Sequence, residues 1–488
     1  MAPFLTDFPT EFLGRKPKSQ LERIEAEIEQ NRSKSISDLA LLFEPVIPSD
    51  TFTDIADKYD GKINVSTTIW AWLSQVFECN GSCQKAVSLI QAWLSESNSK
   101  KRYGAEPKMI SSNTSAYCQS RQALPEEAID YGLELTVDYV NKLIKEEQLW
   151  RGFQIKAIDG SSTKLLDTQA NQEKYQQPPQ QSEGCGFPVM GFGGVLNLST
   201  GCVEALQIGK YTQNDLVAAH ELIDMFSPGD LLLADRAYNS YGFVVQLFMK
   251  GVHSVMRLNE SRIGKNFWNK GKRVGKGQRL VRWKKPRRKS DCMTKEEWDQ
   301  LPAEIEMRYV RVKAPDRNGE MRNIYIATSL LDHEKYPADE IAWLYQKRWD
   351  IEVKFRDIKT TLGYEMCRVN SPEMAEKTMK MVMLAYNLIK AIQAKSIFYG
   401  EVLLDRISFK QTVDLVMSFR PLFLGHQNHP NKKNEIRNEI YNLVEKSILP
   451  QRSRPTEPRV VKTRLKYDLM TISRQKFKTQ IRHELAIS

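Results

Sequence analysis

One stretch decides the fold expected for this chain: YQKRWDIEVKFRDIK, residues 345–359. Read as an α-helix turning about 100° per residue, it gathers four polar side chains within roughly 60° of one face: Tyr345, Arg348, Glu352 and Lys359. A stripe that only packs against a core is apolar. This stripe combines a phenol, two cations and a carboxylate, which suits the binding of a metal ion and phosphate groups.

Two further acidic residues follow segments that read as strands. Residues 153–159 alternate and then become apolar, which is typical of a strand that ends at Asp159. Residues 231–235, LLLAD, predict a short buried strand that ends at Asp235. Open sheets place their sites at the carboxyl ends of strands, so both acids are expected beside Glu352.

The surrounding pattern predicts an α/β core. A strand near 153, a hairpin over 192–208 and then alternating helix and strand up to residue 258 indicate a sheet that is covered on both faces. The segment that follows is basic, with 14 Lys or Arg and one acid in residues 257–289, and it predicts a β-rich insertion. The last helix of the core is expected after Pro337.

The ends of the chain read as helical. Residues 1–145 predict either a helix-turn-helix-like DNA-binding region or a plain helical bundle. Ser371 is a helix cap before a long helix that runs to Lys395. The basic tail, residues 451–488, is expected to be extended or partly disordered on its own. Five domains are therefore expected: 1–145, 146–258, 259–335 for the insertion, 336–395, and 396–488 for a C-terminal region that dimerises or contacts DNA.

Composition limits the possible functions without choosing among them. The 488 residues carry a formal net charge of +11, so nucleic acid and anionic membrane are both possible partners. Seven scattered cysteines predict reduced thiols rather than a disulfide framework or a zinc site. No signal peptide and no apolar run of membrane-spanning length is present, which predicts a soluble, cytoplasmic, nucleoid-associated protein.

The three acids together predict a metal centre. Carboxylate oxygens suit hard cations, so Mg²⁺ or Mn²⁺ is expected, with two ions in one site. Two such ions activate the attacking oxygen and stabilise the leaving oxygen of a phosphodiester. Any one of these acids alone is as easily a surface residue, and the prediction rests on their combination with the Tyr-Arg-Lys stripe.

These motifs resemble those of a known family. Tyr345-x2-Arg348-x3-Glu352-x6-Lys359 is similar to the YREK signature of the DDE transposases of bacterial insertion sequences, of the IS-four type. Residues 158–160 resemble the first-acid motif of that family, and residues 234–238 the second. The resemblance covers about residues 151–395. It implies an RNase H-like fold with a β-rich insertion between the second Asp and the Glu, and cut-and-paste transposition.

The resemblance also implies roles for individual residues. Asp159, Asp235 and Glu352 would be the catalytic metal ligands. The phosphates of the transposon end would be contacted by Tyr345, Arg348, Lys359 and Arg236. Relatives with this signature form a DNA hairpin and stack a flipped nucleotide on aromatic side chains. The candidates for that stacking are Trp268, Trp283, Trp298 and Trp349, although core packing is at least as good an interpretation for each.

The implied partners are double-stranded DNA with terminal inverted repeats, target DNA, and a second copy of the chain in a homodimer. Two other functions remain open. A catalytically inactive, DNA-binding regulator of the same descent would not need to keep all three acids. An RNase H-like nuclease would cut DNA without inverted repeats.

Overall fold

The computed structural model describes residues 37–56, 59, 63–79, 81–99, 111–315, 320–397, 404–450 and 472–487. Parts of the predicted N-terminal domain (1–36 and 100–110) and of the basic tail (451–471) lie outside them. The chain forms two compact units, one of Met1–Gln75, Gly81–Ala128 and Phe419–Arg437, the other of Val76–Asn80, Ile129–Ser418 and Asn438–Ser488. Within the described residues, no helix is both long and apolar enough to cross a membrane.

The first unit is helical. Its core contains Trp70 and Trp72, and the guanidinium of Arg121 lies 4.1 Å from the centre of the Trp72 ring. A buried ion pair of 3.3 Å joins Asp38 to Arg420, so residues far apart in the sequence share this unit. Its helices include α2 (Asp38–Phe43), α4 (Val65–Phe77), α5 (Cys83–Ser99), α6 (Ser115–Ala123) and α16 (Pro421–Gly425).

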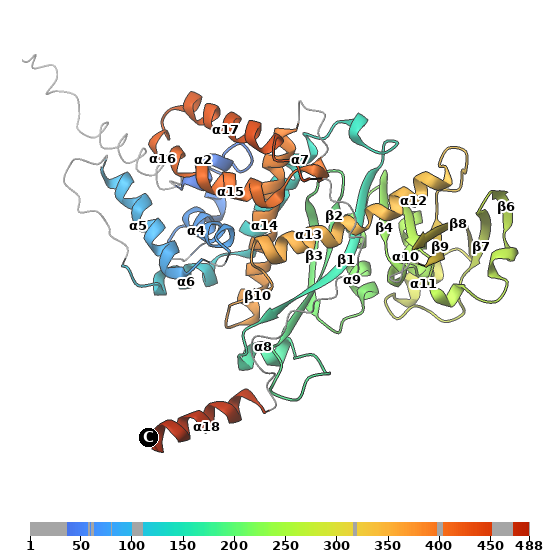
Figure 1. The fold of residues 1–488 in the computed structure, drawn as a ribbon, viewed down its shortest axis with the longest axis horizontal. Helices are drawn as coiled ribbons and strands as arrows, with labels where there is room; N and C mark the ends of the chain where they lie inside the picture. The colour runs from blue at the N-terminus through green and yellow to red at the C-terminus, as the bar shows by residue number, and fades with distance from the viewer. Residues whose placement is uncertain are drawn as a thin grey trace, which may run out of the picture. The chain divides into compact units, whose positions relative to one another are not determined.

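The second unit is built on a large mixed sheet (Figure 1). β1 pairs in parallel with β4, and β4 pairs in parallel with β5, whereas β2 and β3 are antiparallel neighbours on the other side of β1. The strands of this half are β1 (Gln154–Leu165), β2 (Val189–Asn197), β3 (Val203–Lys210), β4 (Asp230–Ala234) and β5 (His253–Arg257). A short strand, β10 (Met366–Cys367), adds to the far end of β1.

The region expected as a β-rich insertion continues this same sheet. β9 pairs antiparallel with β5, and the order then runs on through β8 and β7 to β6. The buried side of this extension holds Trp283, Trp298 and Tyr309 in one apolar cluster with the helix α10 (Tyr241–Met249). Its elements are β6 (Lys272–Gly275), β7 (Gln278–Lys284), α11 (Lys295–Gln300), β8 (Glu304–Pro315) and β9 (Met321–Thr328).

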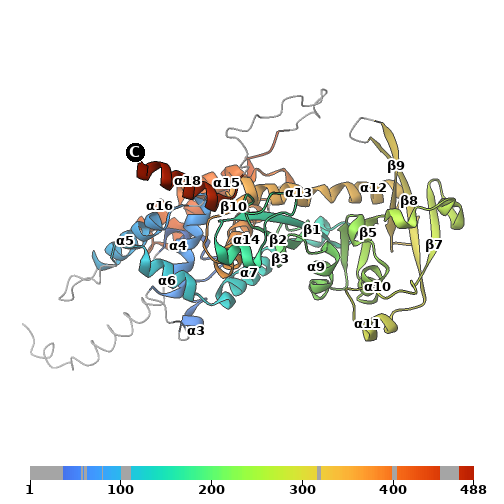
Figure 2. The same ribbon diagram turned by 90° about the horizontal axis from the view of Figure 1, so that it is seen from below.

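Helices cover both faces of the sheet, as expected for an α/β core. Phe355 packs on Gly194 of β2 from one side and Ala218 packs on Gly193 from the other. Figure 2 shows α9 and α10 on the side of the sheet opposite α12 and α13. These four helices are α9 (Asp215–Glu221), α10 (Tyr241–Met249), α12 (Ala338–Lys347) and α13 (Trp349–Arg356).

The long helix α14 (Pro372–Ser396) begins at its expected cap, because the hydroxyl of Ser371 accepts a hydrogen bond from the Met374 amide. Most of α14 is buried. Its Asn387 side chain bonds both backbone groups of Val203 at 2.9 and 2.8 Å, which fixes the helix against the edge strand β3. α15 (Phe409–Phe419) and α17 (Pro430–Glu445) follow close to their expected positions.

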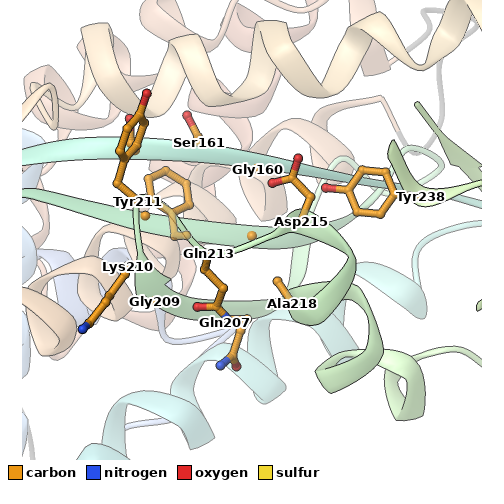
Figure 3. A pocket seen from close by; sticks show the side chains of 14 residues that line it. Gly160, Ser161, Gln207, Gly209, Lys210, Tyr211, Gln213, Asp215, Ala218 and Tyr238 are labelled. Atoms are coloured by element: carbon orange, nitrogen blue, oxygen red, sulfur yellow. The ribbon is translucent and has the colours of Figure 1, made fainter. Parts of the chain in front are cut away.

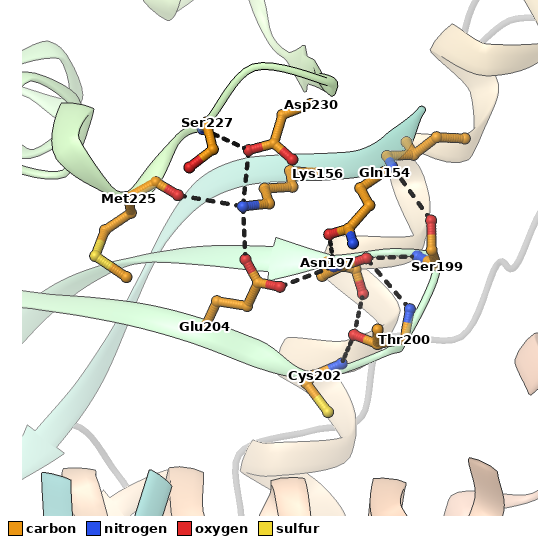
Figure 4. Close-up of polar contacts among 11 residues, drawn as sticks. Gln154, Lys156, Asn197, Ser199, Thr200, Cys202, Glu204, Met225, Ser227 and Asp230 are labelled. Carbon is orange, nitrogen blue, oxygen red and sulfur yellow. Dashed lines mark hydrogen bonds and ion pairs between the residues drawn. The ribbon is translucent and has the colours of Figure 1, made fainter. Parts of the chain in front are cut away.

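Lys156 forms a buried ion network near the start of β1 (Figure 4). Its ammonium lies 2.9 Å from Glu204 and 2.8 Å from Asp230. Burial opposes the charge on Lys156, but the two carboxylates raise its pKa overall. The network links β1 to its neighbour β4 and, across β2, to β3.

Several local expectations were wrong. β1 does not end at Asp159 but continues to Leu165, because the antiparallel hairpin partner β2 supports it over its whole length. The end of the tail is not extended, since residues Arg474–Ile487 form helix α18, whose Arg474 is bonded to Asp167 at 3.1 Å.

The helix expected over residues 345–359 is not one regular α-helix. α12 and α13 meet at Arg348, and residues Asp357–Thr361 form a π-helical turn that carries Lys359. The amide of Leu362 donates to the Asp357 carbonyl at 3.2 Å, which is the five-residue spacing of a π-turn. Lys359 is therefore displaced from the position that an ideal helix gives it.

Candidate active site

The pairing of β1 with β4 sets the first two acids side by side. Ala157 is the register partner of Leu233, so Asp159 and Asp235 stand at the same level two residues further along. There the two strands diverge, because β4 ends at Ala234 while β1 continues with β2. The two acids thus lie on neighbouring strands, at the level where the parallel part of the sheet stops.

Arg348 links the catalytic helix to this level of the sheet. Its guanidinium lies 3.5 Å from Asp159 and 3.2 Å from Glu352, and the residue is 6% exposed. Burial opposes its charge, but Tyr345 and then Asp235, Asp159 and Glu352 raise the pKa of Arg348 overall. One buried cation therefore interacts with three carboxylates from β1, β4 and α13.

Tyr345 and Lys359 stand on either side of this cation. The hydroxyl of Tyr345 donates to Asp235 at 3.4 Å, and burial, followed by the Asp235 charge, raises the pKa of Tyr345 to about 12. Lys359 shares a cavity of about 230 Å³ with Asp159 and Glu352. Burial lowers the pKa of Lys359 although Glu365 opposes this effect. All four stripe residues thus face one region.

Sequence reasoning missed Asp215 (Figure 3), the first residue of α9, whose charge acts on Asp159. Burial raises the pKa of Asp159 to about 6, and Glu352 and Asp215 contribute to the same effect by repulsion. Burial and then Asp235 raise the pKa of Asp215 itself. The only possible signal in the sequence was Asn214, a typical helix cap before an acid, and that pattern is too common to mark a site.

The chain is similar to known proteins over the region that carries these residues. Residues 150–388 match the family model described as a transposase DDE domain. The transposase InsG of insertion sequence element IS4 from Escherichia coli (strain K12) is 26% identical over 353 residues, which are 72% of this chain and 76% of InsG. Residues 150–388 therefore form a domain of the DDE transposase family, and over most of its length the chain is similar to a transposase of IS4 type. Membership of this family implies metal-dependent DNA cleavage and strand transfer.

A solved structure of piggyBac transposase, in a synaptic complex with hairpin DNA, is similar to this chain. The alignment covers 87% of this chain and 88% of the piggyBac chain. The TM-score is 0.44 and the sequence identity 10%. This likeness is too distant to assign a fold or a mechanism to the transposase.

The remaining predicted DNA contacts of the transposase have very different surroundings. Arg236 is exposed and forms an ion pair with Glu260, which leaves it near the catalytic edge. Trp283 and Trp298 are 2% and 7% exposed and belong to the core of the sheet extension. A base could stack on either one only if that core opened, so both are packing residues.

Two tryptophans remain accessible for stacking. Trp349 is 58% exposed at the start of α13, and the Arg348 guanidinium lies 5.1 Å from its ring centre. Trp268 is half-buried, with Arg311 at 5.0 Å and the ring of Tyr325 at 5.5 Å. Of the two, only Trp349 adjoins a residue that touches the candidate metal ligands.

The donor set of the transposase fits a hard divalent cation. Asp159, Asp235 and Glu352 supply only oxygen, and the single buried cation among them is Arg348, so negative charge is in excess. In the described part of the chain, no three acidic, histidine or cysteine side chains are already gathered closely enough to hold an ion. Repulsion between unneutralised carboxylates, with Arg348 between them, explains that separation.

Proposed function

We propose that this transposase excises and reinserts its own element by cutting at terminal inverted repeats. The observation that carries the proposal is the contact of Arg348 with Asp159 and Glu352, next to Asp235. Structural roles alone would not require three acids from separate elements to surround one buried arginine. Strand order β3-β2-β1-β4-β5, with β4 and β5 added in parallel, supports an RNase H-like core.

In this proposal Asp159, Asp235 and Glu352 are the metal ligands, and the ions are Mg²⁺ or Mn²⁺, two in each site. When bound, such ions activate the attacking oxygen and neutralise charge on the phosphate. Tyr345, which bonds Asp235, holds that carboxylate in place. Once the acids turn to an ion, the guanidinium of Arg348 is free to bind a DNA phosphate.

Lys359 and Arg236 lie on either side of the acids and would hold the DNA backbone there. Fixing the phosphate in line with the attacking group supplies much of the rate in phosphoryl transfer. Trp349, exposed beside Arg348, is the best candidate to stack an unpaired base of a hairpin intermediate.

The helical region 1–145 would recognise the repeats, and the segment 396–488 would contact a second copy or the DNA.

The test is cleavage of a DNA duplex that carries the ends of the element, with Mg²⁺ or Mn²⁺. Glu352 is largely exposed and Gln has the same shape, so Glu352→Gln should fold and bind this DNA. We expect a loss of cutting of at least 1,000-fold, on the order of the loss for removing a principal electrostatic group. Undiminished cutting would remove Glu352 from the site.

Two matched substrates separate the alternatives. A duplex of the same length and composition with scrambled ends should not be cut, whereas a general nuclease would cut it equally. An inactive regulator would bind the end duplex and cut neither. Excision of a marked element in cells, lost with Glu352→Gln, gives the same distinction in vivo.

A further inference from the structure

The helices that carry the polar stripe are interrupted at a single residue. α12 ends at Lys347, α13 begins at Trp349, and Arg348 between them belongs to neither. The amide of Arg348 donates to the Tyr345 carbonyl, and the amide of Ile351 donates to the Arg348 carbonyl, each at 3.2 Å. Both bonds span three residues, as in a 3₁₀-turn, instead of the four of an α-helix. The chain is therefore wound more tightly at the point from which Arg348 reaches the acids.

The local sequence does not account for this interruption. Residues 345–351, YQKRWDI, contain neither proline nor glycine, which are the usual causes of a broken helix. Gln, Lys and Arg, which stand immediately before and at the break, are all good helix formers. A tertiary contact is therefore the remaining cause.

One ammonium group contacts both sides of the break. Lys347 Nζ, at the end of α12, lies 3.7 Å from Asp350 in the first turn of α13. The same nitrogen lies 2.6 Å from Asp405, which belongs to the 3₁₀-turn η8 (Leu404–Arg406). The ring centre of Trp343, one turn earlier in α12, is 5.6 Å away. Lys347 thus ties the end of one helix to the start of the next and to a third element.

Asp405 is a fixed point for this contact. The amide of Leu449 donates to the Arg406 carbonyl at 2.7 Å, and the guanidinium of Arg406 donates to the Leu449 carbonyl at 2.6 Å. Beside them, Ile407 forms a β-bridge with Ile448. The carboxylate is therefore held from outside the catalytic helices, and the ion pair fixes the end of α12 to it.

We propose that Lys347 is a positioning residue for DNA cleavage. Its ion pairs with Asp350 and Asp405 fix the break between α12 and α13, and the break directs Arg348 at the acids. The inference rests on the proposed function, in which Arg348 binds a DNA phosphate once the acids hold metal. The ammonium of Lys347 is already bound by two carboxylates, so its role differs from the phosphate contact proposed for Lys359.

Cleavage kinetics test this assignment. Lys347→Met removes the ammonium and keeps most of the aliphatic chain, and Asp405→Asn removes the charge of its partner without changing its shape. With Mg²⁺ and saturating full-length protein, each should slow cutting of the end duplex about 10–100-fold, the usual effect of losing a supporting contact. The affinity for that DNA should stay that of the wild type. Asp339→Asn, at an exposed acid in the first turn of α12, is the control and should cut as the wild type does.

A merely structural role predicts other results. Both ion pairs are partly exposed, so either substitution should lower the melting temperature by no more than about 2–4 °C. Lys347→Arg keeps the charge and should restore most of the cutting rate. If Lys347 acts through Arg348, Lys347→Met should add little to the loss caused by Arg348→Ala. General destabilisation would add its full effect to that loss.

Each contrary result is distinct. If Lys347→Met and Asp405→Asn cut at the wild-type rate while Arg348→Ala does not, this inference is overturned and the proposed function stands. Additive losses in the double variant, or a rate for Lys347→Arg as low as that for Lys347→Met, also overturn it. Should Lys347→Met fail to fold, Asp405→Asn gives the same comparisons. Undiminished cutting by Arg348→Ala would overturn the role proposed for Arg348, and this inference with it.

Discussion

At the scale of single residues, the site is governed by an excess of negative charge around one guanidinium. The chain holds Asp159 in the interior although burial disfavours its ionised form. Arg348 compensates part of that cost through its 3.5 Å contact. If these acids are the metal ligands proposed above, divalent cations should stabilise the protein, because neutralising the acids removes their mutual repulsion.

The raised pKa of Asp159 predicts a pH-dependent stability in metal-free protein. With a folded pKa of about 6 against 3.8 unfolded, its contribution is favourable at low pH and is lost as the pH rises through about 6. Asp159→Asn should therefore gain little at pH 4 and up to about 3 kcal/mol at pH 7.5. Chemical unfolding in EDTA at both pH values measures this, and an equal effect at both would contradict it. Glu221→Gln, at an exposed acid of α9, is the control.

At the scale of elements, the catalytic helix is shaped by its packing. Ile351, Phe355 and Ile358 point into the core, as the helical period predicts. The π-turn, Asp357–Thr361, then adds one residue to a helical turn. The helix ends at Gly363, whose φ of +71° lies in the left-handed region that glycine adopts readily. Lys359 reaches the cavity with Asp159 from this turn, so its position depends on a local irregularity.

Substitution of two tryptophans, one buried and one exposed, should have different effects: loss of stability in the first case and loss of DNA binding in the second. Trp283 lies inside the sheet extension, where its indole donates to the Tyr309 hydroxyl at 2.7 Å. Trp283→Ala should cost about 3–5 kcal/mol of stability. Trp349→Ala, at an exposed position, should leave the melting temperature unchanged and weaken binding of unpaired end DNA roughly 5–150-fold, equivalent to about 1–3 kcal/mol of lost stacking.

Thermal unfolding and fluorescence anisotropy with hairpin-ended DNA check both variants. Binding of fully paired DNA is the control for Trp349→Ala, because no base is free to stack there. If Trp349→Ala binds hairpin and paired DNA with unchanged affinity, Trp349 has no stacking role. A stable Trp283→Ala would contradict its place in the core.

At the scale of the whole molecule, basic charge dominates. The net charge of +11 is concentrated around the sheet extension, where exposed cations such as Lys272, Lys276 and Lys284 lie apart from the acids of the catalytic edge. Such a surface attracts a polyanion at long range, while the acidic edge repels it until metal is bound. We expect divalent ions to strengthen DNA binding for this reason.

DNA binding should therefore weaken steeply with salt. A plot of log affinity against log salt concentration should have a slope near −0.9 for each phosphate contacted. Lys284→Gln should make that slope less steep by about one contact, whatever the DNA sequence. Lys250→Gln, whose ammonium already pairs with Asp224 at 2.8 Å, is the control and should change nothing. Equal slopes for wild type and Lys284→Gln would remove the extension from the DNA path.

The sequence by itself determined the local features of this protein. Spacing in residues 345–359 identified the polar stripe, and the run before Asp235 identified a buried strand, because side-chain periodicity is a property of neighbours along the chain. The α/β class and the cap at Ser371 were predicted for the same reason. These features sufficed for the family resemblance.

Only the tertiary structure decided which groups meet. Asp215 lies against Gly160 because α9 packs on β1, and no pattern of neighbours along the chain records that contact. The extension of β1 beyond Asp159 depends on its pairing with β2, and the burial of Trp283 depends on β8 and α10. Long-range packing, which overrides local preference where apolar surface must be covered, fixed these positions.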